Sequence, residues 1–381
     1  MDAKQKPRVV LVHDWLTGMR GGEKCLEALC RRWPKAPLFT LLHRPETTAA
    51  VIERRPIYTS WLQALPGIHR YYRFTLPLMP LATRGWRLPA CDLVVSCSHC
   101  VAKSARPPRG VPHVCYCLTP MRYAWHMREA YFGSGNRIGP RSRLLDLLRD
   151  WDRRTAQRVT HFVAISRTVQ ERIAYCYRRL STVIYPPVDT QFYCPAPVRR
   201  EDFYLIVSAL APYKRLDLAI EACNRLGRRL VIIGSGQEER RIRSLAGPTV
   251  EMLGWQSDAV IRDHLRRTKA LLFPGEEDFG IVPVEAQACG APVIAYGRGG
   301  ATETVLPLGG AVEPTGLWFE EQNFECLIAA IESFEAHHDR FDPAAARSQA
   351  LRFRREIFER ELFGYLDAVL MGTRAADREA A

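Results

Sequence analysis

Two glycine-rich loops in the second half of the chain have the pattern of a phosphate-binding site. Each follows a short apolar segment, residues 270–273 for the first loop and residues 292–296 for the second. In an open α/β sheet, loops of this kind lie at the edge where the strands end. Their free N–H groups and the dipole of the following helix favour anions there. These residues therefore predict a site for a phosphorylated ligand.

The first of these loops also carries carboxylates. It reads Pro-Gly-Glu-Glu-Asp-Phe-Gly over 274–280 and is followed by Pro283 and Glu285. Pro283 suits the first turn of a helix, where an N–H donor has no intrahelical partner. Glu285 is therefore predicted in that first turn, with the helix ending at Cys289. The simpler interpretation is a solvated acidic loop and a glutamate that only complements the helix dipole, which is worth about 0.3–1 kcal/mol.

A related turn lies near the N-terminus. Residues 8–13 form an apolar strand pattern, the turn that follows ends in Gly21-Gly22, and a helix is predicted from about Glu23. Strand, glycine-rich turn and helix together can cradle a phosphate. Two adjacent glycines alone are equally typical of an ordinary turn.

Apolar strands alternate with helical segments along the 381 residues of the chain. This alternation and this length predict an α/β protein with two doubly wound domains. A proline-rich stretch near residue 195 separates them. We predict a Rossmann-like domain over 1–195, a second over 196–355, and a C-terminal helix over 356–381 that crosses back to the first domain. The helical pattern itself runs from about Pro343 to Leu370.

Charge is distributed unevenly. Residues 1–200 hold 33 Lys and Arg against 13 Asp and Glu, a balance of +20, whereas the remainder holds 21 against 28, a balance of −7. An anionic partner is therefore expected for the first domain only. Residues 66–88 mix aromatic and aliphatic residues with four arginines, which is typical of a surface that docks on an anionic membrane. An amphipathic pair of helices packed on the core is the alternative.

No run of eighteen apolar residues predicts a membrane span, and the first residues do not have the pattern of a signal peptide. A protein at the cytoplasmic face of the cell membrane is therefore expected, with its twelve cysteines as buried thiols. Cys97, Cys100, Cys115 and Cys117 have the spacing of a four-thiolate zinc set, but their flanks read as strands. No recognised nucleic-acid-binding module accompanies the basic half.

Taken together, the motifs resemble those of the retaining GT-B glycosyltransferases of family 4, most closely mannosyltransferase-like members that act in bacterial surface polysaccharide synthesis. The resemblance covers nearly the whole chain. Its most specific motif is Glu277-x7-Glu285, and its supports are Gly21-Gly22, Pro-Tyr-Lys214, Gly254-Trp255 and Gly299-Gly300-x2-Glu303. It implies two Rossmann-like domains that face a central cleft, the first for the acceptor and the second for a nucleotide sugar.

The resemblance also implies residue roles. Glu277 would hydrogen-bond the donor sugar and Lys214 would neutralise the diphosphate, so these two are the catalytic candidates. Glu285 would bind the ribose, because a carboxylate can accept hydrogen bonds from two neighbouring hydroxyls. The other implied donor-binding residues are Gly21, Gly22, Arg215, Gly236, Gly254, Trp255, Phe279, Gly280, Ile281 and Arg298. His99 and Arg122 are the acceptor-side candidates.

Two positions depart from the family pattern. Ala209 stands where the family usually has an arginine, which removes a cation from the diphosphate site; Arg215 or Arg298 could replace it. Leu118 stands where the family often has a histidine that contacts the donor sugar, and His99 is the candidate substitute. Either departure is compatible with a changed donor preference or a reduced activity.

We therefore expect a retaining hexosyltransferase that uses a nucleotide-diphosphate sugar, with GDP-mannose favoured, and a lipid-diphosphate-linked or other saccharide acceptor. No acidic Asp-x-Asp motif follows a predicted strand, so a reaction without metal or cofactor is expected. A nucleotide-sugar epimerase, a phosphorylase and a non-catalytic sugar-nucleotide-binding protein of the same fold are the alternatives.

Overall fold

The chain divides into two compact units in a computed structural model that describes residues 6–128 and 139–379. Unit 1 comprises Met1–Pro186 and Phe358–Ala381, and unit 2 comprises Pro187–Ile357. The division falls after Pro186, whereas the sequence predicts a boundary after residue 195. The intervening segment belongs to unit 2 because Val188 donates a hydrogen bond of 2.9 Å to the carbonyl oxygen of Phe353.

Unit 1 is built on a parallel seven-stranded sheet with the order β3-β2-β1-β4-β5-β6-β7. The strands are β1 (Val9–His13), β2 (Leu38–Thr40), β3 (Ile57–Thr59), β4 (Leu93–Ser98), β5 (His113–Cys117), β6 (His161–Ala164) and β7 (Ser181–Val183). The chain runs outward from β1 through β2 to β3 and then returns to place β4 on the other side of β1. The topological switch point of this sheet therefore lies between β1 and β4. Every residue of β1, β4 and β5 is buried, as expected for strands covered on both faces.

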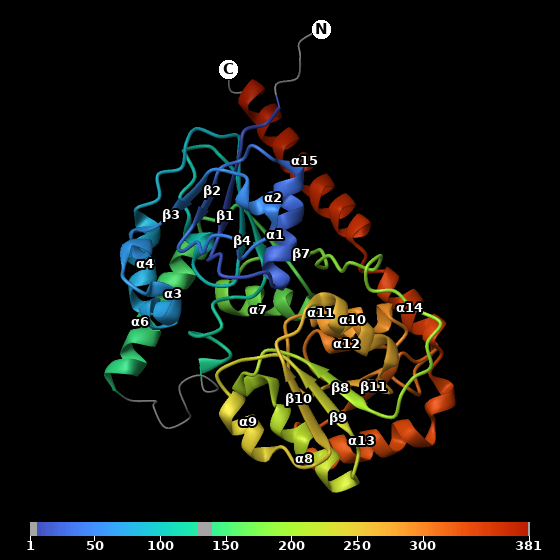
Figure 1. Ribbon diagram of the computed structural model, residues 1–381. Coiled ribbons are helices and arrows are strands. Elements are labelled where there is room, and N and C mark those ends of the chain that lie inside the picture. Colours follow the sequence, from blue (N-terminus) through green and yellow to red (C-terminus); the bar gives the residue numbers. More distant parts are fainter. Residues whose placement is uncertain (1–5, 129–138, 380–381) are drawn as a thin grey trace. The chain divides into compact units, whose positions relative to one another are not determined.

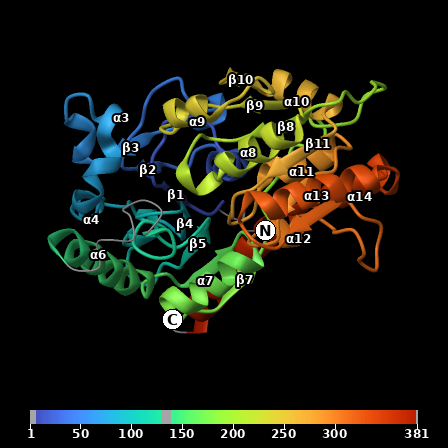
Figure 2. The ribbon, with the colours of Figure 1, turned by 90° about the horizontal axis from the view of Figure 1, so that it is seen from below.

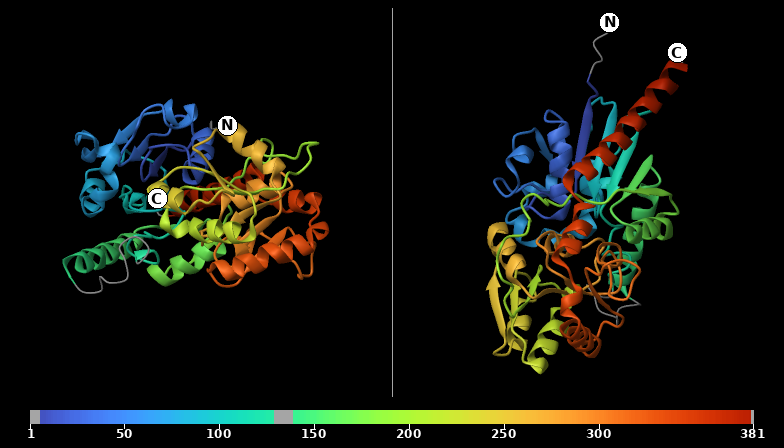
Figure 3. Two further views of the ribbon diagram at one scale, coloured as in Figure 1. Left: turned by 60° about the horizontal axis from the view of Figure 1, so that its bottom comes forward. Right: turned by 90° about the vertical axis from the view of Figure 1, so that its right-hand side faces the viewer.

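Helices cover both faces of this sheet (Figure 1), with α1 and α2 on one side and α3, α4 and α6 on the other. The helical elements are α1 (Gly21–Arg32), α2 (Ala50–Glu53), η1 (Trp61–Ala64), α3 (Ile68–Tyr71), η2 (Tyr72–Leu78), α4 (Met79–Arg84), η3 (Ala102–Ser104), α6 (Pro140–Ala156) and α7 (Arg167–Tyr177). The last helix, α15 (Arg355–Glu379), runs along unit 1 (Figure 3). Its Phe358 ring lies 5.6 Å from that of Tyr116, and its Asp367 pairs with Arg32 at 2.9 Å.

Unit 2 contains a parallel six-stranded sheet with the order β10-β9-β8-β11-β12-β13. The strands are β8 (Tyr204–Val207), β9 (Leu230–Ile233), β10 (Val250–Gly254), β11 (Ala270–Phe273), β12 (Val293–Tyr296) and β13 (Gly316–Phe319). Here the switch point lies between β8 and β11, because β9 and β10 extend the sheet on one side of β8 and β11 to β13 on the other.

The helices of unit 2 follow the strands in alternation. They are η4 (Pro212–Lys214), α8 (Leu216–Leu226), α9 (Glu239–Leu245), α10 (Asp258–Arg267), α11 (Ile281–Ala288), α12 (Ala301–Thr304), α13 (Phe324–Ala336), η5 (His338–Arg340) and α14 (Pro343–Leu351). Figure 2 shows α8 and α13 side by side. Both contribute apolar residues to one core cluster with β8, β9 and β11.

The predicted continuous helix from Pro343 to Leu370 is wrong at one point. It is broken between α14, which ends at Leu351, and α15, which begins at Arg355. At the break Phe353 is buried, and its ring lies 5.4 Å from the ring of Phe279. Among the described residues, no helix combines the length and the apolar character needed to cross a membrane.

Candidate functional site

The loops that follow β11 and β12 in unit 2 are joined directly. The N–H of Gly300 donates a hydrogen bond of 2.8 Å to the carbonyl oxygen of Glu277, and Gly299 forms an isolated parallel bridge with the same residue. Only glycine fits this approach. A Cβ on Gly299 would lie 2.4 Å from the Glu277 carbonyl oxygen, and one on Gly300 would lie 2.2 Å from the Cα of Phe279. The glycines therefore fix the position of the acidic loop.

The two predicted catalytic residues, Lys214 and Glu277, are brought together in unit 2. Lys214 ends η4, directly after β8, and its ammonium group forms an ion pair with the Glu277 carboxylate. Gly275 permits this approach, because a Cβ there would lie 2.9 Å from the Cα of Lys214. The side chains of Lys214 and Glu277 are 12% and 23% exposed, so the pair is largely enclosed but accessible. It lies at the switch point between β8 and β11, where open α/β sheets bind their ligands.

The two cations that could replace the missing arginine at Ala209 are placed differently. Arg215 adopts a left-handed backbone conformation with φ 51°, and its guanidinium pairs with Asp217 at 3.1 Å. It also donates to the carbonyl oxygen of Gln322 at 3.4 Å. Arg298 is exposed on the loop after β12. Arg215 is thus already paired in unit 2, whereas Arg298 is exposed to solvent.

Helix α11 carries Glu285 in its second turn, and the prediction of the first turn is wrong. Gly280 is the N-cap residue, with φ 82°, so the chain enters the helix at Ile281 and Pro283 is its third residue. Glu285 is buried, and its carboxylate lies farther from the helix N-terminus than the sequence suggests. The N–H groups of Phe279, Gly280 and Ile281 begin this helix, and their predicted contact with a sugar diphosphate stays a prediction.

The predicted nucleobase-side residues lie after β9 and β10. Gly236 approaches the loop after β8 so closely that a Cβ would be 2.3 Å from the carbonyl oxygen of Leu210. Gly254 has φ 66°, and its carbonyl oxygen accepts a 2.7 Å hydrogen bond from Gly234. The neighbouring Trp255 is exposed. The structure therefore provides an uncovered indole at this edge of the unit 2 sheet.

Gly21 and Gly22 open helix α1 in unit 1. A Cβ on Gly22 would lie 2.7 Å from Cδ1 of Leu118, so the side chain at position 118 covers this turn. Of the predicted donor-binding residues, these two glycines belong to unit 1 and the others to unit 2.

A buried histidine–glutamate pair lies beneath this turn. Nδ1 of His13 is 2.9 Å from the carbonyl oxygen of Cys97, and Nε2 is 3.4 Å from the carboxylate of Glu23. Burial disfavours the charged form of His13, but the hydrogen bond and the charge of Glu23 outweigh burial and raise the pKa of His13. Both neighbours are hydrogen-bond acceptors, which favours the protonated form of the imidazole.

Asp14, the next residue, is buried and surrounded by donors. Its carboxylate accepts hydrogen bonds from four successive backbone N–H groups, those of His99, Cys100, Val101 and Ala102, at 2.6, 3.0, 2.6 and 2.7 Å. Nδ1 of His99 lies 3.1 Å from the same carboxylate. Burial raises the pKa of Asp14, but the charge and hydrogen bonds of His99 more than reverse this, so its net pKa is lowered. Asp14 therefore fixes the turn after β4.

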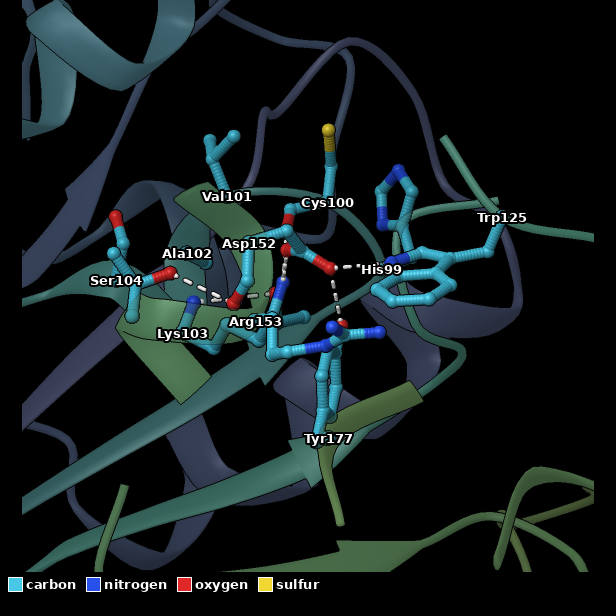
Figure 4. Close-up of polar contacts among 12 residues, drawn as sticks. His99, Cys100, Val101, Ala102, Lys103, Ser104, Trp125, Asp152, Arg153 and Tyr177 are labelled. Atoms are coloured by element: carbon cyan, nitrogen blue, oxygen red, sulfur yellow. Dashed lines mark hydrogen bonds and ion pairs between the residues drawn. The ribbon is translucent and has the colours of Figure 1, made fainter. Parts of the chain in front are cut away.

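The same turn is held from its other side by a buried ion pair. Figure 4 shows Asp152 with Lys103, Trp125 and Tyr177 around it. Lys103 pairs with Asp152 and donates to the carbonyl oxygen of Cys100 at 2.6 Å. Asp152 also accepts hydrogen bonds from Trp125 at 2.9 Å and Tyr177 at 2.7 Å. This network connects the turn after β4 to α6 and α7.

Both acceptor-side candidates lie in this part of unit 1. His99 follows β4, and Arg122 is close enough to Cys100 for its charge to oppose the rise in the pKa of that thiol. Burial keeps that pKa well above its usual value. The part of the chain that the structure describes, which includes the four cysteines with zinc-like spacing, contains no group of three or more His, Cys, Asp or Glu placed to hold a metal ion.

Sequence reasoning missed His13, Asp14, Glu23, Lys103 and Asp152. One signal could have found the first two: a histidine and an aspartate directly after an apolar strand stand where parallel sheets bind ligands. No local signal links Lys103 to Asp152, because 49 residues separate them.

Comparison with known proteins finds sequence similarity mainly in unit 2. Residues 195–348 match the family model described as glycosyl transferases group 1. A GDP-mannose-dependent alpha-mannosyltransferase of Mycolicibacterium smegmatis is 32% identical over 166 residues, which cover 43% of this chain and 42% of that protein. A GDP-mannose-dependent monoacylated alpha-(1-6)-phosphatidylinositol monomannoside mannosyltransferase of Corynebacterium glutamicum is 37% identical over 121 residues, covering 28% and 32%. The chain thus spans less than half the length of these relatives.

Solved structures match along nearly the whole chain. Anabaena Alr3699/HepE in complex with UDP has a TM-score of 0.70 and 17% identity, covering 95% of this chain and 100% of that one. Sucrose-phosphate synthase of Thermosynechococcus elongatus has a TM-score of 0.71 and 16% identity, covering 96% and 100%. The predicted α/β fold of the GT-B type, with two Rossmann-like parallel-sheet units, is confirmed.

Proposed function

We propose that this chain, which has the GT-B fold and carries a unit of the glycosyl transferases group 1 family, transfers a hexose from a nucleotide-diphosphate sugar to a saccharide acceptor. The observation that carries the proposal is the Lys214–Glu277 ion pair at the switch point of unit 2, inside the segment that matches the family. Mannose from GDP-mannose is the favoured donor, because the relatives named above are GDP-mannose-dependent.

The donor would be held by charges and backbone groups of unit 2. Lys214 neutralises the diphosphate, and the N–H groups that begin α11 add their dipoles. Glu277 accepts hydrogen bonds from hydroxyls of the sugar, and the buried Glu285 accepts them from the ribose. Fixed donors aimed at a leaving group are usually the largest contribution to catalysis of this kind. Lys214 and Glu277 form an ion pair with each other, so binding of the donor would replace one charged partner of each residue with another.

Transfer is proposed to retain the configuration of the anomeric carbon. The bond from that carbon to the diphosphate breaks, the acceptor oxygen bonds on the same face, and the leaving phosphate oxygen takes the proton of the acceptor. A retaining hydrolase would use two carboxylates about 5–5.5 Å apart, whereas Glu277 is paired with a lysine. We expect the reaction to proceed without a metal ion, because Lys214 and the helix N-terminus supply positive charge to the diphosphate.

The acceptor is proposed to be linked to a lipid diphosphate and to reach unit 1 at the inner face of the cell membrane. Residues 54–91 contain six arginines and no acidic residue. Within them, η2 and α4 bury Leu76 and Met79 in the core but leave Phe74 84% exposed and Leu81 also exposed. Leu147 of α6 is a further exposed apolar residue of unit 1. Apolar side chains beside arginines suit an interface with anionic lipid.

A thermal-shift panel of GDP, UDP, ADP and their sugars tests the donor, since a ligand at about 100 times its dissociation constant adds about 2.7 kcal/mol to stability. We expect GDP-mannose to stabilise the chain most. If only a UDP-sugar stabilised the chain, that sugar and not GDP-mannose would be the donor. If no nucleotide stabilised it, the proposed function would be wrong. Product analysis then separates the alternatives: an epimerase converts the donor without acceptor, and a binding protein converts nothing.

A further inference from the structure

Each unit places a pair of polar side chains across its own topological switch point. In unit 2 the pair is Lys214 and Glu277, after β8 and β11. In unit 1 the switch point lies between β1 and β4, which pair in parallel from Val9–Leu93 to His13–Cys97. Asp14 follows β1 and His99 follows β4, and their side chains are 3.1 Å apart. The position at which open α/β sheets bind ligands is therefore occupied by a polar pair in both units.

Hydrogen bonds, an ion pair and a ring contact hold the unit 1 pair, Asp14 and His99, in place. Asp14 is anchored by the four backbone N–H groups of the turn after β4. The carbonyl side of that turn is anchored by Lys103, which is itself paired with the buried Asp152. The Trp15 and His99 rings form a T-shaped contact, with centroids 4.5 Å apart and an interplanar angle of 88°. Three buried charged side chains, those of Asp14, Lys103 and Asp152, therefore hold this turn.

The contact with Asp14 determines which nitrogen of His99 carries a proton. The Asp14 carboxylate accepts hydrogen bonds only, so Nδ1 of His99 carries the proton that faces it. In the neutral form of the imidazole the lone pair then lies on Nε2. Within the described residues no protein group hydrogen-bonds this Nε2, and the His99 side chain is 18% exposed. His99 can therefore accept one hydrogen bond from a ligand hydroxyl.

We propose that His99 binds a hydroxyl group of the acceptor saccharide through Nε2, and that Asp14 is the positioning residue that holds the imidazole in the required tautomer and orientation. The proposal rests on the proposed glycosyltransferase function and names the acceptor-binding residue of unit 1. The family resemblance left two roles open for His99, an acceptor-side residue and a substitute for a donor contact, and the proposal assigns it to the acceptor. The proton of the reacting hydroxyl still leaves with the phosphate oxygen, so His99 is a binding residue in this scheme.

Substitutions of His99 by Asn and by Gln distinguish the roles of its two imidazole nitrogens. In His99→Asn the carboxamide can reach Asp14 in place of Nδ1 but leaves the position of Nε2 empty. In His99→Gln the carboxamide extends to the position of Nε2. With a synthetic prenyl-diphosphate-linked saccharide as acceptor, we expect His99→Asn to raise the acceptor KM about tenfold, the effect of one hydrogen bond, and His99→Gln to raise it less. The donor KM should stay unchanged in both. His161→Asn, at the start of β6, is the matched control.

Nitrogen NMR of histidine-labelled full-length protein tests the geometry without any turnover. The resonances of His99, assigned by their loss in His99→Gln, should show the Nδ1–H tautomer, and the Nε2 resonance should shift when the acceptor is added. An Nε2–H tautomer would overturn the proposal, as would an acceptor KM in His99→Asn equal to that of the wild type. Failure of the proposed function is distinguishable, because the wild type would then bind no nucleotide sugar in the thermal-shift panel, whatever the tautomer of His99.

Discussion

The N–H of Gly300 donates a 2.8 Å hydrogen bond to the carbonyl oxygen of Glu277, so the loop after β12 holds the loop that carries the proposed catalytic glutamate. Gly300 and Glu277 are therefore directly linked, although they are 23 positions apart in the sequence. We expect a change at Gly300 to reduce stability and a change at Glu277 to reduce transfer.

Gly300→Ala should destabilise unit 2. The new Cβ would lie 2.2 to 2.4 Å from three backbone atoms of Phe279, and backbone cannot move aside as a flexible side chain can. Overpacking of this kind costs about 1–3 kcal/mol, so the melting temperature should fall and donor binding should weaken. Gly297→Ala in the same loop is the control, because its Cβ would make ordinary contacts at 3.4 Å. Equal stability of the two variants would contradict the close approach.

Glu277→Gln should abolish most transfer without unfolding the chain. The substitution keeps the shape of the side chain but removes its charge, so both the pairing with Lys214 and the hydrogen bonds to the sugar weaken. We expect a loss in kcat of about a hundredfold or more, measured with GDP-mannose, and an unchanged far-ultraviolet circular dichroism spectrum. Glu221→Gln, which removes a carboxylate from the exposed pair with Arg225 on α8, should have little effect. Full activity of Glu277→Gln would remove the assignment.

The stability of unit 1 should decrease at acid pH because of His113. This residue is fully buried at the start of β5, with Nε2 2.8 Å from the hydroxyl of Ser96, and burial lowers its pKa to about 4. Because the pKa of His113 is lower in the folded chain than in the unfolded chain, the unfolded chain binds the proton at a higher pH. The contribution of neutral His113 to the free energy of unfolding is therefore fully present above the unfolded pKa near 6.5. It is lost as the pH falls towards 4, by an amount on the order of 3 kcal/mol.

His113→Gln should remove this dependence. Denaturant unfolding of the wild type and the variant between pH 7 and pH 4 should give a stability difference that shrinks as the solution is acidified. His13 works in the opposite direction, because Glu23 raises its pKa, but it is present in both proteins and cancels in the comparison. A difference that does not change with pH would contradict the buried neutral state of His113.

Replacement of Phe74 and Leu81 by glutamate should weaken binding to anionic vesicles. Both side chains are exposed on a segment that is rich in arginine, and the substitutions add negative charge while they remove apolar surface. Co-sedimentation with phosphatidylglycerol vesicles at low salt is the measurement. Val312→Glu, an exposed apolar position in unit 2, is the control. If both variants bound vesicles equally well, the surface around Phe74 and Leu81 would not be the membrane-binding surface.

The sequence predicted the strands with long apolar runs and missed some of the short ones. The apolar segments at 8–13, 270–273 and 292–296 correspond to β1, β11 and β12, which are mostly buried, as parallel strands covered on both faces are. β2 and β3 have three residues each, too few to show a period, and neither they nor β13 were predicted. The boundary after residue 195 followed a change in composition, whereas the units separate at Pro186 because Val188 binds the backbone of Phe353.

The site was predictable where chemistry and spacing coincide in one loop, as for Glu277 in its glycine-rich sequence. It was not predictable where the partner lies far along the chain. Asp14 reads as an ordinary loop aspartate, and only the fold brings the four N–H groups of residues 99–102 onto it. The roles of Arg298 and Trp255 stay predictions, with both side chains exposed.

Unit 1 is assembled from both ends of the chain, because residues 358–381 group with residues 1–186. Phe358, Leu362 and Leu366 of α15 are buried. During synthesis, unit 2 can fold as soon as its own continuous stretch has left the ribosome. The core of unit 1 is complete only when these apolar side chains, which follow unit 2 in the sequence, pack on it. A stop codon before residue 358 is therefore expected to leave the first-made half of the protein dependent on chaperones, and the second half intact.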